Sequence, residues 1–170
     1  LIKDANRDKI FNEIDKLDKI ISDKDYLLIY YAGHGQRVNN KAYWVGVNSN
    51  SKDKYYQMVN VNELTNSLEN IKARHIFFMI DSCYAGISFN NKSSKIEDID
   101  NSINAIKNSL LNYSRKVLTS GHNEEVIDTY FKGEHSLFAK GFLKVLEDND
   151  SSFTAETLYV EIKKMHQMDE

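Results

Sequence analysis

Residues 80–86 read Ile80-Asp81-Ser82-Cys83-Tyr84-Ala85-Gly86 and hold the only cysteine of the 170-residue chain. The apolar run before them, residues 75–80, has the aromatic and β-branched composition of a strand buried on both faces. Cys83 is then expected just past the carboxyl end of a strand, where open α/β sheets place ligands and reactive groups. A lone cysteine is more often a small buried hydrophobic residue, so this stretch needs a second signal before it indicates function.

That second signal is a stretch of the same design. Residues 25–31 are another apolar run that predicts a buried strand, followed by Ala32-Gly33-His34-Gly35-Gln36. His34 is therefore also expected just past a strand end, between two glycines that let the backbone approach closely. Because neighbouring strands lie about 4.8 Å apart, side chains just beyond two adjacent carboxyl ends are within reach of each other.

At these residues the chain resembles the caspase-like cysteine peptidases, and the metacaspase and bacterial branch more closely than the animal caspases. The motifs are Tyr30-Tyr31-Ala32-Gly33-His34-Gly35 and Asp81-Ser82-Cys83-Tyr84-Ala85-Gly86, with a weaker match at Val117-Leu118-Thr119-Ser120-Gly121. The 83 − 34 = 49 residues between histidine and cysteine agree with the spacing of about 50 known for caspases. The resemblance runs from about Asn6 to the C-terminus.

The resemblance implies an α/β, caspase-like (caspase-hemoglobinase) sandwich in which helices flank a mostly parallel central sheet. The family's first strand and helix should precede Asn6 and find no counterpart here. We therefore expect one N-terminally incomplete peptidase domain over residues 1–170, completed by further segments or domains of a longer parent chain.

Composition narrows the function classes. A hydrophobic share of 41% and a charged share of 28% are ordinary for one soluble globular domain. The net charge of −3 gives no electrostatic case for a nucleic-acid or membrane partner. A single cysteine excludes an intrachain disulfide and favours a reducing, cytoplasmic location, and no apolar run approaches the ~18 residues that span a bilayer.

The chemistry of the two motifs predicts a Cys–His dyad. A thiolate attacks a carbonyl carbon, and a histidine beside it raises the thiolate fraction and later protonates the leaving amine. Cys83 is the predicted nucleophile and His34 the predicted general base and acid. The resemblance implies that the backbone N–H groups of Gly35 and Cys83 bind the oxyanion. We expect no cofactor and no metal site, since one cysteine and scattered histidines have no zinc-ligand spacing; the resemblance leaves a calcium requirement open.

For specificity, the resemblance implies that Asp81 lies in the first substrate pocket and selects a Lys or Arg before the scissile bond. The alternative is that Asp81 accepts backbone N–H bonds in the tight turn. The family's small hydroxyl residue two positions before the histidine is Ala32 here, so one polar contact is lost. Ser120 and His122, after the third predicted strand, are further candidates for substrate contact. The acidic loop at residues 121–133 either borders the cleft or is simply solvated.

The remaining pattern predicts the elements that surround these strands. Asn6 or Asp4 caps a helix that runs to Ile21, and Asn60 opens another with a capping-box-like sequence. Residues 37–41 are expected as a mobile polar loop before a short strand at 43–47. Residues 135–146 predict a helix with its apolar stripe inward (Phe138, Phe142, Val145 and Leu146), and residues 153–165 a last helix. Residues 87–112 predict an exposed linker containing a helix near its end, with Lys92 and Lys95 as the expected sites of maturation cleavage.

Three functions fit these features. The first is an endopeptidase that cuts protein or peptide substrates after Lys or Arg. The second is a catalytically dormant scaffold that uses the same fold to bind partners. The third is transfer of the acyl group to an amine instead of water, which needs the same dyad. The presence of both His34 and Cys83 favours an enzyme over a scaffold.

Overall fold

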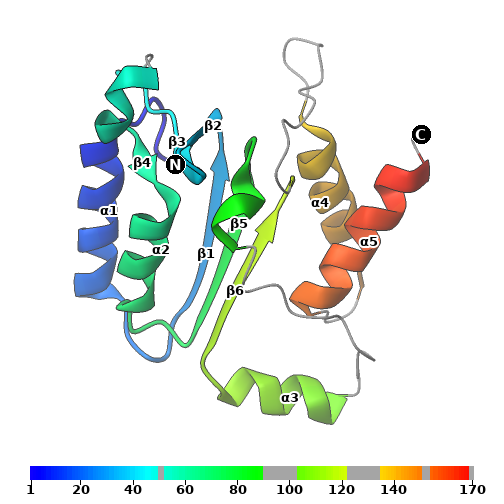
Figure 1. The fold of residues 1–170 in the computed structure, drawn as a ribbon. Coiled ribbons are helices and arrows are strands. Elements are labelled where there is room, and N and C mark those ends of the chain that lie inside the picture. Colours follow the sequence, from blue (N-terminus) through cyan, green and yellow to red (C-terminus); the bar gives the residue numbers. More distant parts are fainter. Residues whose placement is uncertain (50–51, 90–102, 122–134, 151–153, 169–170) are drawn as a thin grey trace.

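A computed structural model describes residues 1–49, 52–89, 103–121, 135–150 and 154–168 (Figure 1). The helices are α1 (Arg7–Ile20), α2 (Val61–Glu69), α3 (Ile103–Leu111), α4 (Leu137–Asp148) and α5 (Ala155–Met168), with 3₁₀ turns η1 (Lys52–Gln57) and η2 (Ala85–Phe89). The strands are β1 (Tyr26–Ala32), β2 (Gly35–Val38), β3 (Lys41–Trp44), β4 (Val59–Asn60), β5 (His75–Asp81) and β6 (Ser114–Thr119).

The main sheet has the strand order β1-β5-β6, and both pairings are parallel. Tyr26 pairs with His75 and Ala32 with Asp81, so β1 and β5 start and end level with each other. Ile80 pairs with Thr119 at the end of β6. The carboxyl ends of all three strands therefore meet at one edge of the sheet. This confirms the prediction that the strands before His34 and Cys83 end beside each other.

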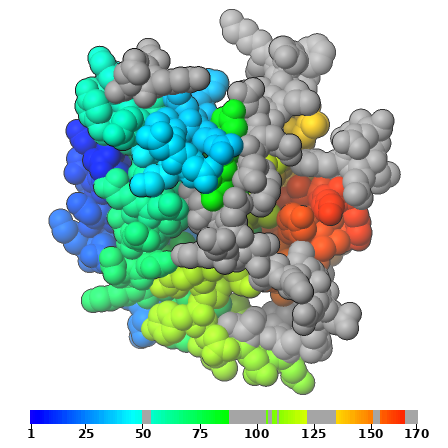
Figure 2. Space-filling model, viewed as in Figure 1, coloured from blue at the N-terminus to red at the C-terminus, as the bar shows by residue number. Residues whose placement is uncertain are grey.

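Helices cover the sheet on both faces (Figure 1). Successive strand residues point to opposite faces, so Ile76, Phe78 and Ile80 join the core under α1 and α2. Met79 joins a second core under α4 and α5. The predicted two-faced burial of residues 75–80 is confirmed. The space-filling view shows α1 (blue) and α2 (green) packed side by side on one side of the molecule and α5 (orange to red) on the other (Figure 2).

The prediction that residues 25–31 are buried on both faces is wrong. β1 alternates between exposed and partly buried residues, and Tyr26, Leu28 and Tyr30 are 59%, 56% and 40% exposed. Within the described residues β1 pairs only with β5 and forms an edge of the sheet. A continuous apolar run has the same composition whether one face or both are covered, so the sequence pattern does not separate the two cases.

Residues 37–41, predicted as a mobile loop, instead form an antiparallel hairpin of β2 and β3. Asn39 and Asn40 both have positive φ, 48° and 61°, which is the backbone of a two-residue type I′ turn. Asparagine tolerates this conformation, and its polarity led to the loop prediction. The strand expected at 43–47 is β3, displaced toward the turn.

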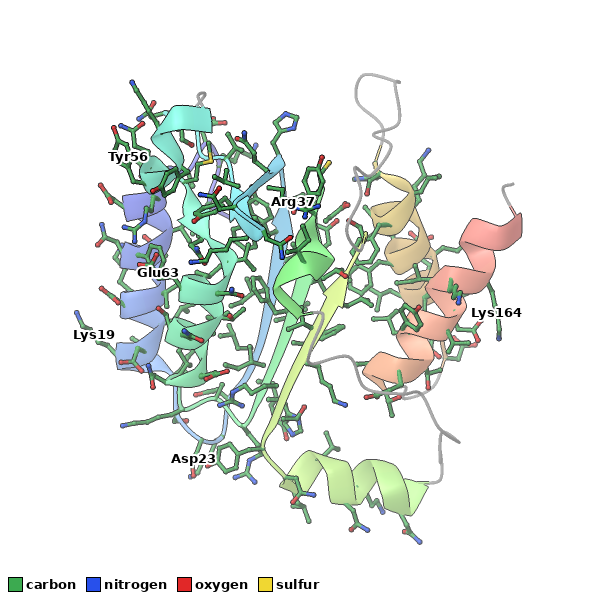
Figure 3. All side chains as sticks on the ribbon, in the orientation of Figure 1. Lys19, Asp23, Arg37, Tyr56, Glu63 and Lys164 are labelled. Carbon is green, nitrogen blue, oxygen red and sulfur yellow. The ribbon has the colours of Figure 1, made fainter. Side chains whose placement is uncertain are left out.

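The helix starts follow the predicted caps. The Asn6 side chain accepts from Lys9 N at 2.9 Å, and Asn60 accepts from the second and third N–H groups of α2. An ion pair between Arg7 and Glu63 joins α1 to α2, and Figure 3 labels Glu63 on that side of the molecule.

On α4, Phe138 and Val145 are buried as predicted, but Leu146 is 46% exposed. Leu146 lies one residue, about 100°, around the helix from Val145 and so falls outside the stripe that contacts the sheet. The prediction for Leu146 is therefore wrong.

The predicted linker at 87–112 is described only in part. Ile87 lies in η2 and packs, partly buried, against the core cluster under α1 and α2. α3 forms where the apolar spacing predicted a helix. Lys92, Lys95 and the acidic loop from residue 122 lie outside the described residues. None of the described helices is long and apolar enough to cross a membrane.

Candidate active site

The two predicted catalytic side chains follow strand ends that are hydrogen-bonded neighbours. Ala32 and Asp81 end β1 and β5 and are paired in register. Gly33 N donates to Asp81 O at 3.2 Å, so the two backbones stay together one residue beyond the strands. His34 and Cys83 each follow two residues after the paired ends and lie at the same edge of the sheet.

Gly35 brings the two loops into direct contact. A β-carbon added at Gly35 would lie 2.0 Å from the Cys83 carbonyl oxygen and 3.1 Å from Ser82 Oγ. No side chain fits in that space, so the position requires glycine for close backbone approach. The sequence motif identified Gly35 as open to a ligand, whereas the structure shows that its immediate neighbour is the Cys83 peptide group.

The backbone of His34 is held by the core. Its carbonyl oxygen accepts from Val45 N at 2.9 Å and from the Tyr31 hydroxyl at 3.2 Å. The Tyr31 ring stacks on Trp44 with centroids 3.5 Å apart, and Trp44 is buried. Burial raises the pKa of Tyr31 above its usual range, so its hydroxyl stays protonated as a donor. The imidazole itself is exposed and therefore accessible to a substrate.

Cys83 lies in a tight turn between β5 and η2. It is partly buried, and Ser82 before it is only 5% exposed. Tyr84 after it has φ 59°, a left-handed backbone conformation that residues other than glycine rarely adopt. Gly86 N donates to Gly121 O at 3.2 Å, which ties the turn to the end of β6. Such strained backbone beside a nucleophile candidate is typical of functional sites.

Asp81 has two hydroxyl partners that sequence reasoning missed. The Tyr30 hydroxyl donates to Asp81 Oδ2 at 2.9 Å, and the Ser136 hydroxyl donates to the same oxygen. Ser136 Oγ also caps α4 by accepting from Ala139 N at 3.0 Å. Burial, followed by the negative charge and hydrogen bond of Asp81, raises the pKa of Tyr30 above its usual range. Ser136 was recognisable as a helix cap from its position, but its contact with Asp81 was not.

The remaining predicted residues are distributed as follows. Ala32 is exposed at the end of β1, opposite Asp81. Ser120 N donates to Ile80 O at 3.0 Å, while Ser120 Oγ is buried and finds no hydrogen-bond partner within the described part of the chain. His122 lies outside the described residues. In the described ranges no three His, Cys, Asp or Glu side chains gather as a metal site would require.

A parallel sheet between helices, with cysteine and histidine beyond adjacent strand ends, is the arrangement of a caspase-like α/β domain. A family model described as the Caspase domain matches residues 1–167. The chain therefore belongs to the caspase family, and the predicted caspase-like fold is confirmed. Membership indicates a cysteine peptidase that acts on protein substrates. No curated protein matches the chain significantly.

Proposed function

We propose that this caspase-family protein is an endopeptidase with a Cys83–His34 dyad that cuts after Lys or Arg, as in the metacaspase branch. The observation that carries the proposal is the register of β1 and β5. It aligns Ala32 with Asp81 and places Gly35 against the Cys83 peptide group.

The reaction follows from the roles of the two side chains. His34 takes the thiol proton, and the Cys83 thiolate attacks the substrate carbonyl carbon. The N–H groups of Gly35 and Cys83 stabilise the negative charge that develops on the carbonyl oxygen. His34 then protonates the departing amine, which leaves a thioester on Cys83. Water, deprotonated by His34, hydrolyses this thioester and regenerates the thiol.

The surroundings of Asp81 support a basic substrate residue. Its carboxylate is partly buried and receives two neutral hydroxyl donors. In the described ranges it forms no ion pair, so its charge lacks a protein counter-ion there. A guanidinium or ammonium from the substrate supplies that counter-ion through a charge-assisted hydrogen bond. An acidic residue would meet repulsion worth several kcal/mol.

The test uses fluorogenic peptides that differ only at the residue before the scissile bond. Cys83→Ala and His34→Ala should each abolish cleavage after Arg or Lys while leaving the circular dichroism spectrum unchanged. The double variant should be little worse than either single one, because the two side chains act as a unit. Substantial cleavage by purified Cys83→Ala, or efficient wild-type cleavage after Asp, would contradict the proposal.

Two measurements on the wild-type protein distinguish the proposed function from the two alternatives. An activated Cys83 should be alkylated rapidly at pH 6 to 7, whereas a thiol that reacts like unactivated cysteine, with pKa about 8.5, indicates the dormant scaffold. Mass analysis of the products with an added amine distinguishes hydrolysis from acyl transfer. An amide product with that amine would indicate the transferring enzyme.

A further inference from the structure

Three elements converge on one oxygen atom at the edge of the site. Asp81 ends β5, Tyr30 comes from β1, and Ser136 precedes α4. Both hydroxyls donate to Oδ2 of Asp81. A carboxylate has two acceptor oxygens, and a pair of donors on one of them fixes the rotation of the whole group. Within the described residues Oδ1 receives no hydrogen bond, so it remains available to a ligand.

The two donors are themselves fixed by α4. Ser136 Oγ accepts from Ala139 N while donating to Asp81, so one hydroxyl caps the helix and holds the carboxylate. The Tyr30 ring stacks on Phe142, with centroids 6.4 Å apart and planes at 13°. The N-terminus of α4 also carries partial positive charge, which attracts the Asp81 carboxylate.

We propose that Tyr30 and Ser136 are positioning residues that orient Asp81 and thereby set the preference for a cation before the scissile bond. This inference rests on the proposed function. Neither residue touches the reacting bond, and each acts through Asp81. The two hydroxyls hold Oδ2 before substrate arrives, so the carboxylate loses little rotational freedom when a guanidinium or ammonium binds Oδ1.

The test compares peptides with arginine or citrulline before the scissile bond, because citrulline keeps the shape of arginine without its charge. The wild-type protein should prefer arginine. Tyr30→Phe removes one hydroxyl and keeps the ring that stacks on Phe142. We expect it to lower the arginine-to-citrulline ratio of kcat/KM about tenfold, since a hydrogen bond to a charged group contributes about 1.5 kcal/mol and 1.4 kcal/mol is a factor of ten. The loss should appear in KM for the arginine peptide, with kcat and the alkylation rate of Cys83 unchanged.

Substitutions at Ser136 separate orientation of Asp81 from helix capping. Ser136→Gly loses the hydroxyl but keeps most of the capping preference, whereas Ser136→Thr keeps both. We expect Ser136→Gly to lower the arginine-to-citrulline ratio of kcat/KM as Tyr30→Phe does. Ser136→Thr should keep the wild-type ratio. In an Asp81→Ala background neither Tyr30→Phe nor Ser136→Gly should change the ratio further.

The outcomes distinguish this inference from the proposed function. If wild type prefers arginine but Tyr30→Phe and Ser136→Gly keep that preference, the positioning role is overturned while the proposed function stands. Ser136→Ala loses both the hydroxyl and the capping preference. If Ser136→Ala lowers the ratio and Ser136→Gly does not, Ser136 acts only as a cap and the inference fails. A wild-type enzyme that cleaves both peptides equally, or neither, overturns the inference together with the proposed specificity.

Discussion

Replacing Gly35 with alanine tests the close approach of the loop that holds His34 to the loop that holds Cys83. The new β-carbon would lie 2.0 Å from the Cys83 carbonyl oxygen and 3.0 Å from its carbonyl carbon. Real β-carbons do not approach other atoms closer than 3.0 Å, so the loops must separate by at least 3.0 − 2.0 = 1.0 Å. The obstructing atoms are backbone, and both loops continue directly from paired strands. The displacement must therefore move His34 and Cys83 relative to each other.

A misplacement of 1 Å between reacting groups lowers the rate about 100-fold, which corresponds to about 2.7 kcal/mol in the activation free energy. We expect Gly35→Ala to lose at least that factor in kcat/KM on an arginine peptide. The matched control is Gly141→Ala on α4, where the new β-carbon would lie 3.3 Å from Ile162 Cγ2, a side-chain atom. That variant should retain activity. Circular dichroism and urea unfolding confirm that both proteins are folded; a folded Gly35→Ala with activity within threefold of wild type would refute the reasoning.

Two further predictions concern single hydrogen bonds. Tyr31→Phe removes the hydroxyl that donates to the His34 carbonyl oxygen and leaves that oxygen with only the N–H of Val45. One hydrogen bond contributes about 1 kcal/mol, so we expect kcat to fall about fivefold. An unchanged kcat would contradict a role of Tyr31 in holding the His34 backbone. Burial opposes ionisation of Glu156, but the hydrogen bond and charge of Lys116 outweigh it and lower the pKa of Glu156. Its contribution to stability is therefore present above the unfolded pKa of about 4.3 and is lost as the pH falls through the lower folded value. Urea midpoints at pH 7 and pH 3 should differ less in Glu156→Gln than in wild type.

The sequence predicted the two strands and the loops that follow them because both signals are local. An apolar run indicates a strand, and a glycine pair beside His34 indicates close backbone approach. Parallel pairing then places His34 and Cys83 at one edge without any further information. The type I′ turn at Asn39 and Asn40 was also encoded locally, in two residues that tolerate positive φ, but their polarity suggested an ordinary loop.

The surroundings of Asp81 were not predictable in the same way. Tyr30 and Ser136 lie 51 and 55 residues away from it in sequence, on elements whose relative positions depend on helix packing. A tyrosine in an apolar strand reads as a core residue, and a serine before a helix reads as a cap. Tyr30 is in fact 40% exposed, and Ser136 does cap α4, but neither sequence pattern indicates that both hydroxyls donate to one carboxylate. The one-faced burial of β1 depends equally on what packs beside it.

The level ends of β1 and β5 determine where this chain tolerates insertions. Between Ala32 and Asp81 the chain leaves the sheet, forms the hairpin and α2, and returns, so the length of this excursion does not affect the position of either catalytic candidate. The fixed quantity is the offset of two residues from Ala32 to His34 and from Asp81 to Cys83. One residue added within either offset displaces the following side chain by as much as the ~3.8 Å between consecutive Cα atoms. The spacing of 49 residues can thus vary, whereas we expect a single insertion at either strand end to separate the proposed dyad residues, His34 and Cys83.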